Sequence, residues 1–379
     1  MAKSSKNFQK FYHIYFLFNK TYVWRRPFGE DRMLGTFSKL KKPILETLIA
    51  ILIGFIGGAV LMIIFRYDPI TAYVALFQGT LLSVDGIFES LANAVPLMLT
   101  GLTFAIGVRS GYFNVGAEGQ AYIGAMGAVV LAGSISLPPG IHVLATTLFA
   151  MIVGALWSLP VSALKAWRGV HEVVSTIMLN WIALYLVRYL IEYYYYEPGR
   201  AERALPALPT ARYDVIGASL TTFIFVAIGF IVLTYFILWR TTLGYELRLT
   251  GSNPEAARYV GVNYVKIVFL NFFIGGLAAG LAGASQVIGR PPAWTIYKTL
   301  GNVINLGFNG IGVALIGRNH PFGIIFSSIF LGILLYGSRF MQYLGVDPDL
   351  TVAINGIIVL SLSLPELYSI IRKHIVGGR

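Results

Sequence analysis

Residues 217–261 read GASLTTFIFVAIGFIVLTYFILWRTTLGYELRLTGSNPEAARYVG, and this stretch indicates the architecture of the whole chain. Its first half, 217–239, is apolar over enough residues to cross the hydrocarbon core of a bilayer as a helix. Its second half, 240–261, is polar and charged, so it predicts a loop at one membrane surface. Apolar runs of similar length recur along the sequence, and the chain is therefore predicted to consist of membrane-spanning helices.

The polar half of this stretch contains the signals of a short helix. Asn253 suits the N-cap, because its side chain can accept a hydrogen bond from a free backbone N–H of the first turn. Pro254 suits the first helical position, and Glu255 places negative charge at the positive end of the helix dipole. Gly261 can end the helix in a left-handed conformation. A helix this short is marginal in water, so we expect it to pack on another protein.

The composition supports a membrane protein. Of 379 residues, 56% are hydrophobic and only 12% are charged, whereas soluble domains average about 25% charged residues. The predicted fold is therefore all-α and polytopic, with about ten transmembrane helices. The sequence contains no cysteine, which excludes disulfides, thiolate catalysis and thiolate metal sites.

The predicted spans define the domain organisation. They form a transmembrane domain over residues 44–371, preceded by a basic, aromatic extension at 1–43 and followed by a tail at 372–379. The extension is too long and too aromatic for a cleavable signal, and we expect it to lie on an anionic inner leaflet or to form a tail. The ten spans are placed near 44–65, 90–108, 115–136, 141–164, 172–192, 217–239, 265–288, 298–317, 322–343 and 350–371.

The positions of the basic residues predict the orientation. An even number of spans puts both termini on one side, and 21 of the 29 Lys and Arg residues fall on that side, against 8 on the other. By the positive-inside rule, both termini and the loop 240–263 are then cytoplasmic. Residues 66–89 and 193–218 become the two large outer loops. The net charge of +12 reflects this topology and not a nucleic-acid partner.

The spans lack the groups that an ion-coupled carrier or a self-contained pump requires. An ion-coupled carrier usually needs a carboxylate or histidine relay at mid-membrane, and none is clearly placed there. The sequence also has no Gly-x-x-x-x-Gly-Lys-Ser/Thr phosphate loop. The spans carry amides and hydroxyls, which can line a path for a neutral solute or simply join helices.

Two groups of amides are candidates for a solute path. Residues 111–120, GYFNVGAEGQ, precede a helix whose N-terminus would attract partial negative charge on a solute, although a tight turn explains them equally well. In the span 298–317, three asparagines recur at i, i+3 and i+7, which puts them on one helical face. The predicted path residues are Asn114, Glu118, Gln120, Asn180, Asn302, Asn305 and Asn309.

Three motifs occur in an order typical of one family: FNVGAEGQ at 113–120, EVVSTIMLN at 172–180 and GSNPEAARYVGVN at 251–263. On these residues the chain resembles the permease subunits of bacterial ABC importers in the branched-chain amino acid, ribose and nucleoside group. It is most similar to the larger permease of the nucleoside/simple-sugar branch. The resemblance covers roughly residues 44–371 and leaves out the N-terminal extension.

The resemblance implies both partners and a location. Such permeases lie in the bacterial cytoplasmic (inner) membrane and pair with a second permease, either a paralogue or another copy. Two ABC ATPase subunits use ATP and Mg, and an extracytoplasmic solute-binding lipoprotein delivers the solute. This chain itself would bind no cofactor and no metal. The loop 240–263 corresponds to the family's coupling loop, with expected ATPase contacts at Gly251, Asn253, Pro254, Glu255, Ala256, Ala257, Arg258 and Gly261.

The substrate and the competing functions follow from the same residues. Amide-rich spans with few charges favour a neutral solute, with nucleosides first and simple sugars or riboflavin as alternatives. A stand-alone channel or facilitator would leave the short helix at 253–261 without a purpose. A membrane-embedded transferase would need clustered His, Asp or Glu, and only His171 and Glu172 stand together. We therefore expect a transport subunit with no catalytic residues.

Overall fold

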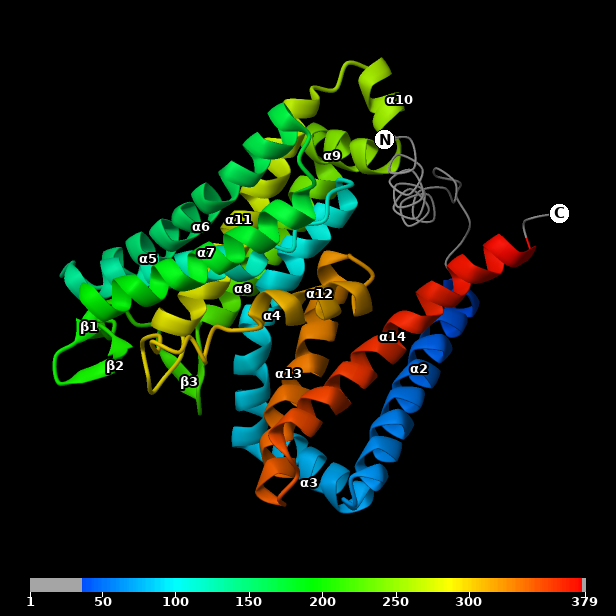
Figure 1. Ribbon diagram of the computed structural model, residues 1–379, viewed down its shortest axis with the longest axis horizontal. Helices are drawn as coiled ribbons and strands as arrows, with labels where there is room; N and C mark the ends of the chain where they lie inside the picture. Colours follow the sequence, from blue (N-terminus) through cyan, green and yellow to red (C-terminus); the bar gives the residue numbers. More distant parts are fainter. Residues whose placement is uncertain (1–35, 377–379) are drawn as a thin grey trace, which may run out of the picture. The chain divides into compact units, whose positions relative to one another are not determined.

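The computed structural model describes residues 36–376, and the side chains of residues 48–362. The described chain is mostly helical, which confirms the predicted all-α class (Figure 1). The predicted extension lies outside these residues up to residue 35, and the predicted tail lies outside them from residue 377. The helices are α2 (Thr36–Ile64), α3 (Pro69–Leu81), α4 (Val84–Arg109), α5 (Ala117–Ser134), α6 (Ile141–Arg168), α7 (Glu172–Tyr193), α8 (Phe223–Arg240), α9 (Thr242–Ser252), α10 (Pro254–Tyr259), α11 (Tyr264–Ile288), α12 (Leu306–Ile316), α13 (Pro321–Tyr343) and α14 (Pro348–Val376).

The chain divides into two compact units. One unit contains α2, the start of α3 and α14. Within it α2 and α14 pack closely: a Cβ at Gly54 would lie only 2.8 Å from the Ile358 Cα atom. The Ser361 hydroxyl also donates to the Ala50 carbonyl at 2.8 Å across this contact. Small residues at a helix interface allow backbones to approach in this way.

The second unit, residues 74–341, has α4 and α11 at its centre. In the most apolar 18-residue window of each helix, 83% of the residues of α4 and 78% of those of α11 are buried. In α6 and α8 the buried share is only 33%. Six described helices are long and apolar enough to span a membrane: α4, α6, α7, α8, α11 and α13. Further apolar segments in α2, α12 and α14 are shorter.

Glycines bring α5, α6 and α11 into contact. A Cβ at Gly124 of α5 would lie 2.4 Å from the Gly280 Cα atom of α11, and a Cβ at Gly154 of α6 would lie 2.6 Å from the same atom. Gly276, one turn before Gly280, faces the Ala155 Cα atom at 2.6 Å. These helices therefore touch backbone to backbone, which is the packing that small residues permit in a membrane protein.

Short strands cover one end of the second unit. Strand β1 (Tyr196–Glu197) pairs antiparallel with β2 (Arg200–Ala204), and β3 (Val215–Gly217) pairs antiparallel with β4 (Leu220–Thr221), with the 3-10 helix η2 (Pro209–Ala211) between the two hairpins. Figure 1 shows the strands and α10 at opposite ends of this unit. We call these the strand end and the α10 end.

The predicted limits of some spans and loops are wrong. The span predicted from residue 217 begins at Phe223, because residues 215–221 pair as a β-hairpin. The predicted outer loop 66–89 contains α3. Pro69 begins this helix, and the carboxylate of Asp68 before it accepts from the Ile70 N–H at 3.0 Å. The hydrogen bond from the Thr71 hydroxyl, and to a smaller extent the one from this N–H, hold the pKa of Asp68 below its ordinary value.

The span predicted at 298–317 is helical only from Leu306 to Ile316. Leu300 and Asn305 both have positive φ, at 59° and 65°, which a right-handed helix does not permit. The side chain of Asn302 donates to the Thr295 carbonyl at 3.0 Å and stabilises this irregular backbone. Residues 289–305 therefore form a non-helical segment that leads into a short helix.

Candidate functional site

The break between α4 and α5 is held in place by Asn180 of α7. The Asn180 side chain accepts from the Gly119 N–H at 2.9 Å and donates to the Val115 carbonyl at 3.0 Å. It thus satisfies a free N–H in the first turn of α5 and a carbonyl of the preceding loop. Both polar atoms of the Asn180 side chain are thus hydrogen-bonded to this break, and the side chain helps to shape it.

Asn114 and Gln120 lie together in the same break. The Asn114 Oδ1 atom accepts from the Gly116 N–H at 3.0 Å and from the Gln120 Nε2 atom at 3.4 Å. Their other amide atoms, Asn114 Nδ2 and Gln120 Oε1, are buried and have no hydrogen-bond partner among the described residues. Asn114 Nδ2 lies against α11, 3.1 Å from where a Cβ of Gly275 would stand.

Asn271 adds a third buried amide in this region. It lies on α11 one turn before Gly275, and neither of its side-chain polar atoms has a hydrogen-bond partner within the described part of the chain. Buried polar groups in proteins are nearly always hydrogen-bonded. Asn114, Gln120 and Asn271 therefore offer neutral donors and acceptors that the described residues do not satisfy. Asn271 is not among the residues predicted for the path.

Glu118 connects α5 to the start of α12. It is buried, and its carboxylate accepts from the N–H groups of Asn305 and Gly307, both at 2.5 Å. The Tyr122 hydroxyl donates to the same carboxylate at 2.5 Å. Glu118 therefore caps the N-terminus of α12 from another helix, where negative charge is favourable. All three donors belong to the protein, so Glu118 has a bracing role here.

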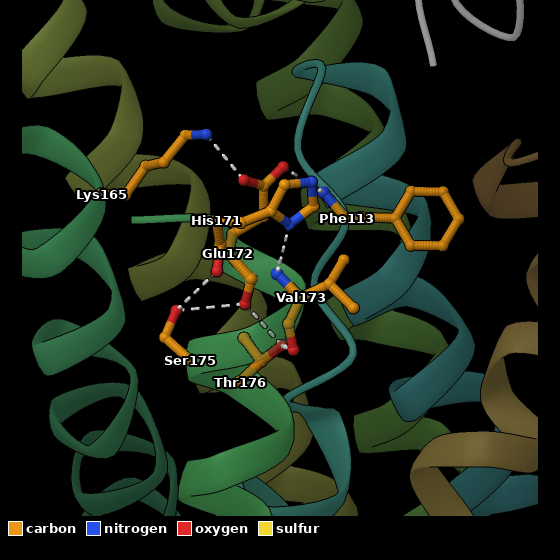
Figure 2. A network of polar contacts seen from close by, with 7 residues as sticks. All are labelled: Phe113, Lys165, His171, Glu172, Val173, Ser175 and Thr176. Carbon is orange, nitrogen blue, oxygen red and sulfur yellow. Dashed lines mark hydrogen bonds and ion pairs between the residues drawn. The ribbon is translucent and has the colours of Figure 1, made fainter. Parts of the chain in front are cut away.

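Glu172 connects three further segments near the α10 end (Figure 2). Its carboxylate forms an ion pair with the Lys165 Nζ atom at 2.7 Å and accepts from the Phe113 N–H in a long contact of 3.5 Å. The neighbouring His171 caps α7 by accepting from the Val173 N–H at 3.3 Å. His171 and Glu172 thus both have structural partners. They do not form a pair of nucleophile and base. The sequence contained this Glu in a motif but gave no sign of its link to Lys165.

The structure contradicts the predicted polar face on the eighth span. Only Asn309 lies within α12, whereas Asn302 and Asn305 lie in the non-helical segment before it. The i, i+3, i+7 spacing places residues on one face only if the backbone is helical throughout. Asn305 joins the site through its N–H, which Glu118 accepts, and Asn302 stabilises the segment through Thr295.

The short helix of the polar loop forms as predicted. The Asn253 side chain accepts from the Ala256 N–H at 3.0 Å, Pro254 begins α10, and Gly261 ends the turn after it at φ +83°. An additional helix, α9, precedes it and was not predicted. A Cβ at Gly251 on α9 would lie 2.2 Å from the Arg109 carbonyl oxygen, so this glycine is needed for packing on α4.

The exposed face of α10 differs in part from the expected contact surface. Glu255 and Arg258 are exposed, but Ala257 is 2% exposed and faces the protein itself. Tyr259 is 90% exposed, which is unusual for a large aromatic side chain and was not singled out from the sequence. The part of α10 available to a partner is thus formed by Pro254, Glu255, Arg258 and Tyr259.

Trp239 braces this loop against the helices. The guanidinium groups of Arg109 and Arg248 lie over its ring at 5.4 and 5.6 Å, and the His320 ring lies 5.0 Å away. Arg248 also donates to the Leu238 carbonyl at 2.9 Å. The loop containing α9 and α10 therefore contacts α4, α8 and the turn before α13.

The site has no metal cluster or catalytic arrangement in the part of the chain that the structure describes. Among the predicted path residues, Asn114, Glu118, Gln120 and Asn180 gather at the start of α5, and the N–H of Asn305 reaches this group. What the arrangement provides is a set of neutral hydrogen-bonding groups between helices and a braced polar loop at one end. Such features suit a transport path and not a reaction centre.

Comparison with known proteins agrees with this geometry. Residues 86–362 match the family described as "Branched-chain amino acid transport system / permease component". The chain is 33% identical to the guanosine ABC transporter permease protein NupP of Bacillus subtilis, covering 84% of this chain and 92% of that protein. It is 30% identical to the nucleoside ABC transporter permease protein NupB of Lactococcus lactis, covering 85% and 91%.

A relative named for another solute is equally similar. The glucose ABC transporter permease protein TsgB13 of Haloferax volcanii is 30% identical, covering 89% of this chain and 90% of that protein. All three relatives are permeases of ABC transporters, and the chain has several helices able to span a membrane. The chain therefore belongs to the branched-chain amino acid transport permease family of ABC transporters, and it is a multi-pass membrane protein and a transport subunit, not an enzyme.

Proposed function

We propose that this permease forms the membrane path for nucleosides in an ATP-driven importer. The observation that carries the proposal is the match to permeases named for nucleosides and for guanosine, which extends over more than four fifths of both chains. Uncharged amides at Asn114, Gln120 and Asn271 support a neutral, hydrogen-bonding solute, because each keeps a buried amide atom without a partner among the described residues. A charged solute would require a compensating charge in a site of this kind.

Simple sugars are the second candidate. The similarity to a permease named for glucose covers as much of the chain as the similarity to the nucleoside permeases. A sugar and a nucleoside share hydroxyl groups, and amides bind hydroxyls by donating and accepting hydrogen bonds. The two candidates therefore differ in whether a base must also be accommodated.

The proposal includes the partners. The similar proteins are permeases of ABC transporters, so the energy is assigned to separate ABC ATPase subunits. A second permease, as a paralogue or a second copy, and an extracytoplasmic solute-binding lipoprotein complete the importer. We assign α10 as the ATPase contact, with the α10 end in the cytoplasm and the strand end outside, as the distribution of basic residues predicts. Glu255, Arg258 and the exposed Tyr259 would enter a groove of the ATPase.

Reconstitution tests the function directly. The permease would be purified with the ATPase, second permease and binding protein encoded beside it, and placed in liposomes. We expect uptake of radiolabelled guanosine that requires internal ATP and the binding protein. Unlabelled nucleosides should compete, whereas glucose should not. ATP-dependent uptake of glucose but not of guanosine would instead support the sugar importer, and uptake without ATP would contradict an importer of either kind.

A further inference from the structure

A small hollow at the strand end is lined by polar side chains that are not among the predicted path residues. It lies between α4, β4 and the end of α11. Its polar lining comes from Ser219, Thr221, Ser285, Gln286 and Arg290. Its inner part has room for roughly one water-sized group, so it would receive a single polar group of a larger ligand.

Arg290 supplies a donor that no other described residue uses. Its Nη2 atom donates to the Glu89 carboxylate at 3.0 Å, but its Nη1 atom is buried and has no hydrogen-bond partner in the described part of the chain. The Glu89 carboxylate compensates the charge of the guanidinium, since the two side chains are both largely buried. A neutral ligand group therefore fits this donor better than a carboxylate or a phosphate.

The other side chains supply acceptors. The hydroxyl of Ser285 donates to the Ala282 carbonyl at 2.6 Å, and that of Thr221 donates to the Gly289 carbonyl at 2.9 Å. Their protons are used within the protein, so both oxygens can only accept from a ligand. Gln286 is 6% exposed, and its one hydrogen bond is a long one of 3.4 Å from Nε2 to the Ser285 oxygen.

We propose that this hollow binds a hydroxyl group of the solute, such as a ribose or sugar hydroxyl. A hydroxyl donates one hydrogen bond and accepts others, which matches the free donor of Arg290 and the acceptors of Ser285, Thr221 and Gln286. A carbonyl could use only the donor, and an ammonium group only the acceptors. The inference rests on the proposed function and adds where, at the strand end, the permease recognises its solute.

Two changes in the hollow test the inference. Gln286→Met keeps the length of the side chain and removes the amide. The paired change Glu89→Gln with Arg290→Gln removes the guanidinium without leaving a buried carboxylate unpaired. The matched control is Glu197→Gln with Arg203→Gln, which removes an Arg–Glu pair of similar burial on the β1–β2 hairpin, outside the hollow. All variants are first checked for a single symmetric peak in size-exclusion chromatography.

The measurement is kcat/KM for uptake of guanosine and of its 2′-, 3′- and 5′-deoxy analogues by the reconstituted importer. The binding protein is the same throughout, so its own preference cancels when each variant is divided by the wild type. Both hollow variants should lower guanosine uptake about 3- to 10-fold, the range for losing one or two hydrogen bonds, but should change uptake of one deoxy analogue by less than about 2-fold. The control pair should leave all four solutes unchanged.

An equal decrease for all four solutes in Gln286→Met, or no decrease at all, would overturn the inference. The two proposals can also fail separately. If the wild-type importer takes up glucose and not guanosine, the nucleoside function fails. The hollow is then tested with glucose and its deoxy analogues, and the same selective loss is expected.

Discussion

Glu118 shows how one buried side chain can hold two parts of a membrane protein together. Its carboxylate receives three short hydrogen bonds, two from the start of α12 and one from Tyr122 on its own helix. The close approach leaves no space, since a Cβ at Gly307 would lie 2.3 Å from the Glu118 nitrogen. The short helix α12 thus depends on a residue of α5 for its cap.

Glu118→Gln should destabilise the protein although it preserves the shape of the side chain. The two oxygens of the carboxylate accept from all three donors. In Gln one of these oxygens is replaced by an NH2 group, which is itself a donor and would leave a backbone N–H without an acceptor. Leaving a buried N–H unsatisfied costs about 1–3 kcal/mol, so we expect a clear decrease in Tm in detergent. Tyr122→Phe removes one donor and leaves no N–H unpaired, so its decrease should be smaller. Equal Tm values for the wild type and Glu118→Gln would contradict the capping role.

We expect His320 to make the stability of the protein depend on pH. Its ring packs among Trp239, Tyr235 and Phe322, and burial, with the nearby Arg109 charge, lowers the pKa of His320 below its ordinary value. The neutral ring is therefore favoured in the folded state, and the unfolded state takes up the proton more readily. The stabilisation is present above the unfolded pKa of about 6.5 and is lost as the pH falls through the lower folded pKa.

The corresponding prediction is a difference in slope. Between pH 8 and pH 5.5, the Tm of the wild type should fall more steeply than that of His320→Phe, which cannot be protonated. The measurement is thermal unfolding in detergent at several pH values and constant ionic strength. Parallel pH profiles for the two proteins would show that His320 does not contribute to the pH dependence.

At the level of helices, the contact of α5, α6 and α11 depends on glycines. A Cβ at Gly280 would lie 2.4 Å from the Ala150 carbonyl oxygen, which is backbone and can move only with its helix. Gly229 on α8 provides a matched comparison, because a Cβ there would meet no atom within 4 Å. Both are glycines inside long apolar helices, and they differ only in their neighbours.

Gly280→Ala should therefore lower the Tm, whereas Gly229→Ala should leave it unchanged or raise it. Alanine in a helix interior is favoured over glycine by about 0.5–1 kcal/mol. The clash at residue 280 lowers the Tm only if it costs more than this gain. Over-packing a well-filled contact typically costs about 1–3 kcal/mol. Thermal unfolding in detergent measures both variants. A higher Tm for Gly280→Ala would show that α11 can shift without loss.

The elements also show how far the sequence could predict the structure. Long apolar runs predicted most spans, and the capping residues Asn253 and Pro254 predicted α10, because these signals are local. The predicted face of three asparagines failed, because the positive φ at Leu300 and Asn305 depends on contacts with distant residues such as Glu118. The link between Glu172 and Lys165 and the approach of Asn114 to α11 at Gly275 likewise depend on how the helices pack, which apolar periodicity does not specify.

For the whole molecule, the central question is how ATP hydrolysis on a partner could move the path. The exposed part of α10 continues into α9, which contacts α4 through Gly251, and Trp239 links the loop to Arg109 and His320. The central helix α4 also carries Thr100, whose hydroxyl donates to the Leu306 carbonyl at 2.8 Å at the start of α12. A continuous set of contacts thus connects the proposed ATPase surface with the start of α12.

Gly261 and Gly345 allow this coupling to be tested with equal backbone strain. Both have φ near +85°, at +83° and +88°, and neither would place a Cβ within 4 Å of another atom. Valine at either position costs about 1–2 kcal/mol, because a β-branched side chain is strained in the left-handed region.

Gly261→Val and Gly345→Val should therefore lower the Tm by similar amounts. Only Gly261→Val, at the end of α10, should reduce the solute transported per ATP hydrolysed, by at least about fivefold if it removes a typical coupling energy. The measurement is parallel uptake and ATPase activity in the same liposomes. If both variants keep the wild-type ratio, α10 is not the element through which the ATPase drives transport.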